Sequence, residues 1–314
     1  MNNEIECIKG NIFKSKHQTL VNTVNCVGVM GAGIALEFKY RYPEMFDKYV
    51  KHCKENRIQI GTLWVYKVPK STLKVLNFPT KNDWKHPSKY EYLERGLKKF
   101  VETYREQGIT SVAFPMLGAL NGGLDPDKVL DLMKKHLSDC DIPIEIYEYD
   151  THASDNLINP FKDAFMFSSV AELQKQTELG EKTVLNIKEI LEHQELDNLI
   201  HLHKIKGIGQ KTVLACFKFA MNLINTPQPF TQDIFSTKSK NVEKLPSKQP
   251  PTKVIGNKME ISLEEKRTLT GLDEQTIFRI ENKEQEISIG EIRTYCSGLK
   301  ISLLDFVAKN YFLA

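Results

Sequence analysis

Two glycine-rich segments contain the residues best suited to binding chemistry. Residues 28–33, Gly-Val-Met-Gly-Ala-Gly, follow a strand-like run at 21–25 and open a helix-like run at 33–40. Glycine permits positive φ angles and close backbone approach, and the first amide groups of a helix point at whatever lies in the preceding loop. Such a concave array of amides suits an anionic diphosphate. For one loop alone, a turn of purely conformational origin is the alternative.

A second loop of the same kind favours the binding interpretation. Residues 117–123, Leu-Gly-Ala-Leu-Asn-Gly-Gly, also follow a strand-like run and precede a helix. Two such loops at one edge of a sheet can bind a pyrophosphate between them. Neither loop has the form G-x-x-x-x-G-K-[ST], which argues against a nucleotide-hydrolysing P-loop.

Lys81 is the best candidate for a reagent in this half of the chain. It follows Pro79-Thr80 at the carboxyl end of a strand-like run, on the edge where a ligand is expected. A charged lysine stabilises a diphosphate, and a partly desolvated one is a nucleophile. The alternative is a solvated surface lysine. The nearby Asp83 and His86 could move protons, or they belong to an exposed polar loop.

Alternating strands and helices must position these segments. The strand-like runs lie at 21–25, 62–66, 74–78, 111–115 and 144–149, and the helical runs at 33–40, 90–106 and 127–137. This alternation predicts a largely parallel sheet with helices on both faces, and such sheets bind ligands beyond the carboxyl ends of their strands. Asp125 precedes the helical run at 127–137, which predicts an N-cap.

Length and composition indicate several domains. A chain of 314 residues is expected to form two or three domains. We predict domains at 1–152 (α/β), 153–225 (helical) and 259–314 (helical). Between the last two, residues 226–258 contain five prolines and six lysines against two acids, which predicts a flexible basic linker.

Composition also excludes some classes of protein. No apolar run is long enough to cross a membrane, and the amino terminus does not have the pattern of a secretory signal. The six cysteines are scattered without a C-x-x-C pair, which predicts reduced thiols in the cytoplasm and no metal site. The net charge of +3 is too small to indicate a nucleic-acid partner by itself.

The motifs of the first 150 residues resemble those of a known family. Gly10-Asn11-Ile12, Val21–Asn25 and the two glycine loops look like the four ligand-binding stretches of macrodomains. The likeness is closest to the DNA ADP-ribosyl glycohydrolase (DarG) group and to the terminal ADP-ribose glycohydrolase macrodomain. Asn-Phe-Pro-Thr-Lys at 77–81, followed by Trp84 and Ser88-Lys89-Tyr90, strengthens it. The resemblance implies an α/β macrodomain, with a mixed and mostly parallel sheet between helices, followed by all-α helical modules.

The resemblance also implies roles for particular residues. Asn11 would touch the adenine of ADP-ribose, Asn25 would approach the distal ribose, and Lys81 would be the catalytic residue. Val24 or Cys26 would form a wall of the pocket and would not react. No cofactor is implied. The full set of implied ADP-ribose contacts is Asn11, Ile12, Asn22, Asn25, Gly28, Val29, Met30, Gly31, Ala32, Gly33, Thr80, Leu117, Gly118, Ala119, Leu120, Asn121, Gly122 and Gly123. Two departures are Ala32, where many DarG sequences have lysine, and Gly122, where the terminal glycohydrolase has a catalytic aspartate.

The helical half contains a second resemblance. Residues 203–212 resemble the hairpin of a helix-hairpin-helix module, with Gly207 and Gly209 in the turn and Lys206 and Lys211 beside it. In such modules the backbone amides contact a DNA phosphate without reading sequence, and lysines add attraction. The alternative is a tight turn between packed helices.

A third resemblance lies near the carboxyl terminus. Residues 262–307 resemble the Cro/C1-type helix-turn-helix family, with Gly271 at the turn and a shortened first helix. Gln275, Thr276 and Arg279 would then face the DNA groove. The many acidic residues in this region disfavour tight phosphate contact, so a protein-docking module is the alternative.

Together these features favour one function over two alternatives. The leading hypothesis is a hydrolase that removes ADP-ribose from DNA bases, as an antitoxin that opposes a DNA ADP-ribosyltransferase, and that contacts DNA through its carboxyl-terminal modules. The alternatives are a non-catalytic ADP-ribose-binding transcriptional regulator and a hydrolase of acyl-linked ADP-ribose on proteins.

Overall fold

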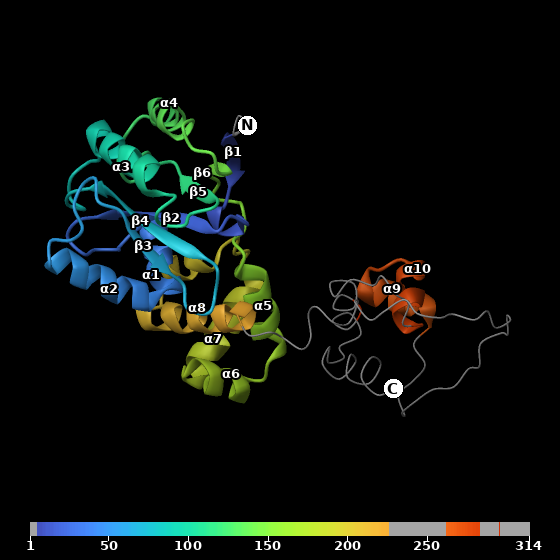
Figure 1. Ribbon diagram of the computed structural model, residues 1–314. Coiled ribbons are helices and arrows are strands. Elements are labelled where there is room, and N and C mark those ends of the chain that lie inside the picture. Colours follow the sequence, from blue (N-terminus) through green and yellow to red (C-terminus); the bar gives the residue numbers. More distant parts are fainter. Residues whose placement is uncertain (1–4, 226–261, 283–294, 296–314) are drawn as a thin grey trace. The chain divides into compact units, whose positions relative to one another are not determined.

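The computed structural model describes residues 5–225, 262–282 and 295. The chain divides into two compact units, Met1–Thr226 and Pro227–Ala314. The first unit contains the sheet and the helices around it (Figure 1).

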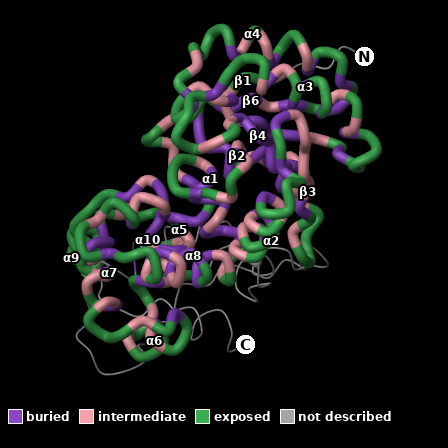
Figure 2. Tube along the Cα trace, turned by 90° about the vertical axis from the view of Figure 1, so that its left-hand side faces the viewer, coloured by how far each residue is buried: buried purple, intermediate pink, exposed green. Residues whose placement is uncertain are grey.

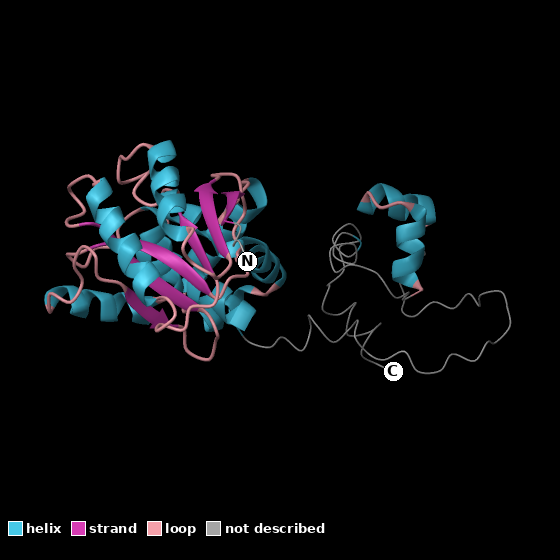
Figure 3. Ribbon diagram, turned by 45° about the horizontal axis from the view of Figure 1, so that its top comes forward, coloured by secondary structure: helices cyan, strands magenta, loops and turns pink. Residues whose placement is uncertain are grey.

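A six-stranded sheet forms the centre of the first unit (Figure 3). Its strands are β1 (Ile5–Gly10), β2 (Thr19–Asn25), β3 (Trp64–Lys67), β4 (Lys74–Lys81), β5 (Val112–Pro115) and β6 (Ile144–Tyr149). They lie in the order β1-β6-β5-β2-β4-β3, and all neighbours are parallel except β3 and β4. The mixed, mostly parallel sheet predicted from the sequence is confirmed.

Alternate residues of the central strands face two separate cores. Val21 of β2, Leu76 of β4 and Phe114 of β5 join one buried cluster with α3 (Tyr90–Thr103) and α4 (Pro126–Leu137). The residues that alternate with them along the strands, such as Leu20 of β2 and Val75 of β4, join another cluster with α1 (Gly33–Arg41) and α2 (Pro43–Lys54). This alternation follows from the two-residue period of a strand. The sheet is therefore covered by helices on both faces, and buried residues run through it (Figure 2).

Helix α2, strand β1 and the short 3-10 helix η1 (Ile12–Lys14) were not predicted from the sequence. Helix α2 begins with Pro43 at its first turn, and its buried residues Met45, Tyr49 and Cys53 are spaced by four, which is a helical signal. Strand β1 lies at the edge of the sheet and is half exposed, so its short sequence carries a weak pattern. The helices predicted at 33–40, 90–106 and 127–137 correspond to α1, α3 and α4.

The helical region packs against α1. It consists of α5 (Ile158–Phe167), α6 (Val170–Thr177), α7 (Glu181–His193), the 3-10 helix η2 (Leu199–Lys204) and α8 (Gln210–Asn225). Its buried cluster includes Leu36 and Tyr40 of α1, and the ring of Tyr40 stacks on that of Phe217 with centroids 5.4 Å apart. Packing therefore continues past residue 152, and the predicted division of the chain there stays a prediction.

A buried ion network also joins α1 to the helical region. The Arg41 guanidinium lies 2.6 Å from the Glu37 carboxylate and 3.4 Å from that of Asp155. Asp155 also accepts hydrogen bonds from the backbone amides of Leu157, Ile158 and Leu199. Because buried charges are costly unless they are paired, this network requires the two regions to stay together.

The described part of the second unit contains two short helices. They are α9 (Leu263–Thr270) and α10 (Glu274–Glu281), joined at Gly271, whose φ of 69° is left-handed as a tight turn requires. Ser262 and Asp273 cap the two helices. The predicted linker at 226–258 and most of residues 283–307 lie outside the described residues, so the helix-turn-helix assignment stays a prediction.

Candidate functional site

Most of the candidate binding and catalytic residues lie at one edge of the sheet. Strands β1, β2, β4, β5 and β6 are parallel, so their carboxyl ends meet at that edge. The first glycine loop (28–33) follows β2, Lys81 ends β4, and the second glycine loop (117–123) follows β5.

The first glycine loop is shaped by Asn25. The Asn25 Oδ1 atom accepts hydrogen bonds from the amides of Val27 and Val29, at 3.0 and 3.3 Å, and its Nδ2 donates to the Val29 carbonyl. The Tyr49 hydroxyl donates to the Asn25 carbonyl at 2.7 Å. Asn25 therefore holds the loop in place with its own polar atoms, and its predicted approach to the distal ribose stays a prediction.

The loop presents its backbone where α1 begins. Gly28 and Gly33 have φ angles of 81° and 58°, a conformation that other residues rarely adopt. Gly31, Ala32 and Gly33 are exposed. The first amides of a helix have no partner within it, so this end of α1 offers donors for an anion.

The second glycine loop is closely packed around Gly122. A Cβ atom added at Gly122 would overlap the Gly118 carbonyl and the Ser88 hydroxyl. The Ser88 amide donates to the Gly122 carbonyl at 3.0 Å, and the Leu124 amide donates to that of Gly118 at 3.1 Å. No larger side chain fits at Gly122 without moving backbone, so the aspartate of the terminal glycohydrolase has no equivalent at this position.

The two glycine loops and Lys81 converge on Asn121. The Lys81 Nζ atom donates to the Asn121 carbonyl at 2.6 Å. A Cβ atom added at Gly33 would overlap the Asn121 side-chain amide, so the first loop touches the second. Lys81 is half-buried, while Asn121 is exposed. The lysine amine thus lies against one of the two loops that would bind a diphosphate.

Several predicted contact residues are engaged in the fold. Asn11 is buried; its Oδ1 accepts from the Phe13 amide at 3.0 Å, and its Nδ2 donates to Asn198 at 2.7 Å. Asn22 is fully buried and donates to Asn77 at 2.9 Å. Ile12 and Thr80 are also buried. Their contact with a ligand stays a prediction.

The carboxylates near the site have structural partners. Asp125 caps α4, accepting from the amides of Asp127 and Lys128, so the predicted N-cap is confirmed. Asp83 accepts from the Lys85 amide at 2.9 Å within a turn, and His86 is exposed beside it.

Cys26 and Tyr149 add apolar character at the same edge. Burial, and next the nearby Cys53, raise the pKa of the Cys26 thiol to about 11, so it stays protonated at neutral pH and is a poor nucleophile. Its predicted role as a wall stays a prediction. Tyr149, at the end of β6, is 44% exposed and was not predicted from the sequence. The signal that could have indicated Tyr149 is its position at the carboxyl end of the last strand, where ligands bind.

The residues predicted to bind DNA belong to the hairpin of the helical region and to α10 of the second unit. In the hairpin, Gly207 has a φ of 90°, Lys206 and Lys211 are exposed, and Ile208 is buried. In α10, Gln275 is exposed, but Thr276 is buried and donates its hydroxyl to Asp273 at 2.7 Å. Arg279 donates to the Thr276 hydroxyl at 3.4 Å.

Clusters of metal ligands and membrane-spanning helices are absent from the part of the chain that the structure describes. Within that part, no group of three or more His, Cys, Asp or Glu side chains is placed to hold a metal ion. Nor does any helix in the described ranges have the length and apolarity needed to cross a membrane.

Comparison with known proteins identifies the class. Residues 21–133 match the family model described as Macro domain. This region includes β2, both glycine loops and Lys81. Over this region the chain is similar to macrodomains.

Among macrodomains, the chain is similar to DNA ADP-ribosyl glycohydrolases. It is 49% identical over 125 residues to the enzyme of that name from Mycobacterium tuberculosis (38% of this chain, 35% of the relative). It is 40% identical over 158 residues to the one from Thermus aquaticus (49% of this chain, 44% of the relative). It is 36% identical over 160 residues to a DNA ADP-ribosyl transferase-DNA ADP-ribosyl glycohydrolase fusion protein from Thermosipho africanus (46% and 41%). The chain thus spans less than half the length of these relatives.

Proposed function

We propose that this chain is a DNA ADP-ribosyl glycohydrolase, which removes ADP-ribose from modified DNA bases. One observation carries the proposal: the Lys81 amine lies 2.6 Å from the Asn121 carbonyl, where the two glycine loops touch. A diphosphate held by the loops would place its attached ribose within reach of this amine. The names of the relatives that share this region support the same activity.

Binding would depend on backbone amides more than on side chains. The amides at the start of α1 and in the second loop would hold the two phosphates, as helix ends and glycine turns do elsewhere. Before the reaction, the Lys81 ammonium adds a positive charge beside them, which stabilises the bound diphosphate.

The reaction breaks the bond between the anomeric carbon of the distal ribose and a nitrogen of the base. The bonding electron pair leaves on that nitrogen, which takes up a proton, and water finally adds its hydroxyl to the anomeric carbon. Lys81 would act as an amine after its ammonium loses a proton to solvent. It would bond to the anomeric carbon or its ring-opened aldehyde, and water would then cleave this bond.

The fusion relative suggests a biological setting. In that protein a DNA ADP-ribosyl transferase and the glycohydrolase share one chain. We place the present chain opposite such a transferase, as an antitoxin that reverses the modification. Genomic DNA as the substrate also implies the cytoplasmic location predicted from the cysteines.

DNA would be held by the helical modules as well. The hairpin residues Lys206, Gly207, Gly209 and Lys211 would contact a phosphate without reading sequence. Gln275, Thr276 and Arg279 would contact DNA only if the second unit binds a groove, and for Thr276 this requires its hydroxyl to leave Asp273.

The activity can be tested with an ADP-ribosylated oligonucleotide and mass spectrometry. The wild-type chain should release ADP-ribose and restore the unmodified mass. Lys81→Ala should reduce the rate by at least about a hundredfold, because it removes the nucleophile. It should still bind ADP-ribose, since the backbone amides remain.

Lys98→Ala is the matched control, because Lys98 is exposed on α3. Full activity of Lys81→Ala would disprove the role of that residue. Binding of ADP-ribose without turnover by the wild type would indicate the non-catalytic regulator, and release from a glutamate-linked substrate alone would indicate the protein hydrolase.

A further inference from the structure

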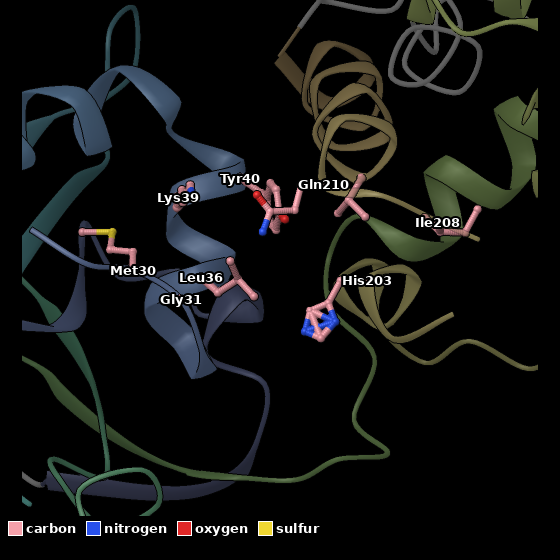
Figure 4. Close-up of a pocket in the computed structure, with 9 residues that line it drawn as sticks. Met30, Gly31, Leu36, Lys39, Tyr40, His203, Ile208 and Gln210 are labelled. Carbon is pink, nitrogen blue, oxygen red and sulfur yellow. The ribbon is translucent and has the colours of Figure 1, made fainter. Parts of the chain in front are cut away.

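A cleft separates the first glycine loop from the hairpin of the helical region. Its volume is about 230 Å³. The walls come from the loop and α1 on one side and from the hairpin and the start of α8 on the other (Figure 4). The lining residues are Met30, Gly31, Leu36, Lys39, Tyr40, His203, Ile208, Gln210 and Val213. Gly31 thus belongs both to the predicted diphosphate loop and to this cleft.

Charge in the helical region is divided between its two parts. Residues 198–225 contain four lysines (204, 206, 211 and 218) and no acid, whereas residues 153–197 contain four lysines and nine acids. The basic part is the hairpin and α8, which form one wall of the cleft. Lys39 stands on the opposite wall, in α1. Lys39 is the lysine that lines the cleft itself, with its Nζ atom 4.6 Å from the centre of the Phe46 ring. The four lysines of residues 198–225 lie on the elements of the opposite wall, outside the lining.

The polar lining suits a nucleic-acid backbone. His203 and Gln210 are exposed and can donate to phosphate oxygens, and Lys39 supplies a charge. Leu36, Ile208 and Val213 give an apolar surface for a sugar ring. Tyr40 is buried and stacked on Phe217, so it offers little face for a base. Such a lining contacts the backbone and does not read sequence.

We infer that this cleft holds the single DNA strand beside the modified nucleotide, with Lys39, His203 and Gln210 as its contacts. The inference rests on the proposed function, since it takes the ADP-ribosyl group to occupy the neighbouring glycine loops. The volume is below the range of about 300–1,000 Å³ of pockets that enclose a drug-sized ligand. A cleft of this size takes a phosphate and its sugar.

A strand in the cleft would lie next to ADP-ribose in the glycine loops, because Gly31 borders both. A modified oligonucleotide would then engage two linked sites at once, and linked sites raise the overall affinity. The oligonucleotide should therefore bind more tightly than ADP-ribose or a modified single nucleoside. This difference should weaken with salt, as phosphate contacts do.

The inference can be tested in the full chain with negative charge introduced into the cleft. We choose His203→Glu combined with Gln210→Glu, because an acid at the first residue of α8 is favourable to the helix and should not unfold it. Gln176→Glu is the matched control: Gln176 is exposed on α6 and does not line the cleft. Circular dichroism on heating checks the fold.

The double variant should raise KM about tenfold for an ADP-ribosylated single-stranded oligonucleotide, which corresponds to about 1.4 kcal/mol. Its kcat, its Kd for free ADP-ribose and its KM for an ADP-ribosylated nucleoside should stay at wild-type values. Equal KM values in variant and wild type, or an equal rise with Gln176→Glu, would overturn the inference.

Binding of an unmodified single strand, followed by fluorescence anisotropy, separates this inference from the proposed function. Loss of that binding in the double variant alone supports the cleft even if the wild type hydrolyses nothing. Wild-type hydrolysis together with unchanged strand binding in the variant would overturn the cleft and leave the glycohydrolase in place.

Discussion

At the scale of single residues, the second glycine loop permits a sharp test. A Cβ atom at Gly122 would overlap backbone, whereas one at Gly123 would meet no atom within 4 Å, although Gly123 has a φ of 75°. We expect Gly122→Ala to lower the free energy of unfolding by about 3 kcal/mol and Gly123→Ala by about 1 kcal/mol. Urea unfolding of the two variants measures the difference. Equal decreases in the free energy of unfolding would contradict this expectation and show that the loop backbone moves to accommodate a methyl group at Gly122.

The residue scale also shows the limits of prediction from sequence. The positions of Lys81 and of both loops followed from strand ends, because the ends of parallel strands share one edge. The partners of Asn11 could not be predicted in this way. Its side chain bonds to Asn198, 187 positions further on, and no local pattern reports such a contact.

At the scale of elements, α1 carries a pH-sensitive group. Burial raises the pKa of Glu37 to about 7, against an opposing effect of Arg41. The unfolded chain has a value of about 4.3. The folded state therefore binds the proton more tightly, so the contribution of Glu37 to stability is greatest below pH ~4.3 and declines as the pH rises to about 7.

Glu37→Gln should remove this part of the pH dependence. Between pH 5 and 8 we expect the wild type to lose on the order of 2 kcal/mol more stability than the variant does. Urea unfolding at several pH values measures both slopes. Glu44→Gln, at an exposed position of α2, is the control and should follow the wild type. Identical slopes for Glu37→Gln and wild type would show that Arg41 keeps Glu37 ionised throughout.

Elements were predicted best where their pattern is local. Strand β4 and helices α3 and α4 have strong apolar periods, and they formed where expected. Edge strand β1 owes its place to pairing with β6, which is more than 130 residues away in the chain. The packing of α8 on α1 has the same long-range origin, so the sequence pattern alone did not indicate it.

At the scale of the whole first unit, the helical region should stabilise the macrodomain. A chain that ends at residue 152 would expose Leu36 and Tyr40, which are 7% and 4% exposed in the intact unit, and would leave Arg41 without Asp155. We expect it to be about 3 kcal/mol less stable than a chain that ends at residue 225. Thermal unfolding compares the two, and equal midpoints would mean that the domains fold independently.

The double packing of α1 has a kinetic consequence. The sheet holds one side of this helix and α8 holds the other, so the glycine loop at its start is fixed before any ligand arrives. Little ordering entropy is then lost on association. ADP-ribose should therefore bind to a loop that already has its bound conformation, at a rate set by diffusion and orientation. The lifetime of the complex should depend on how many amides hold the phosphates rather than on the opening of a lid.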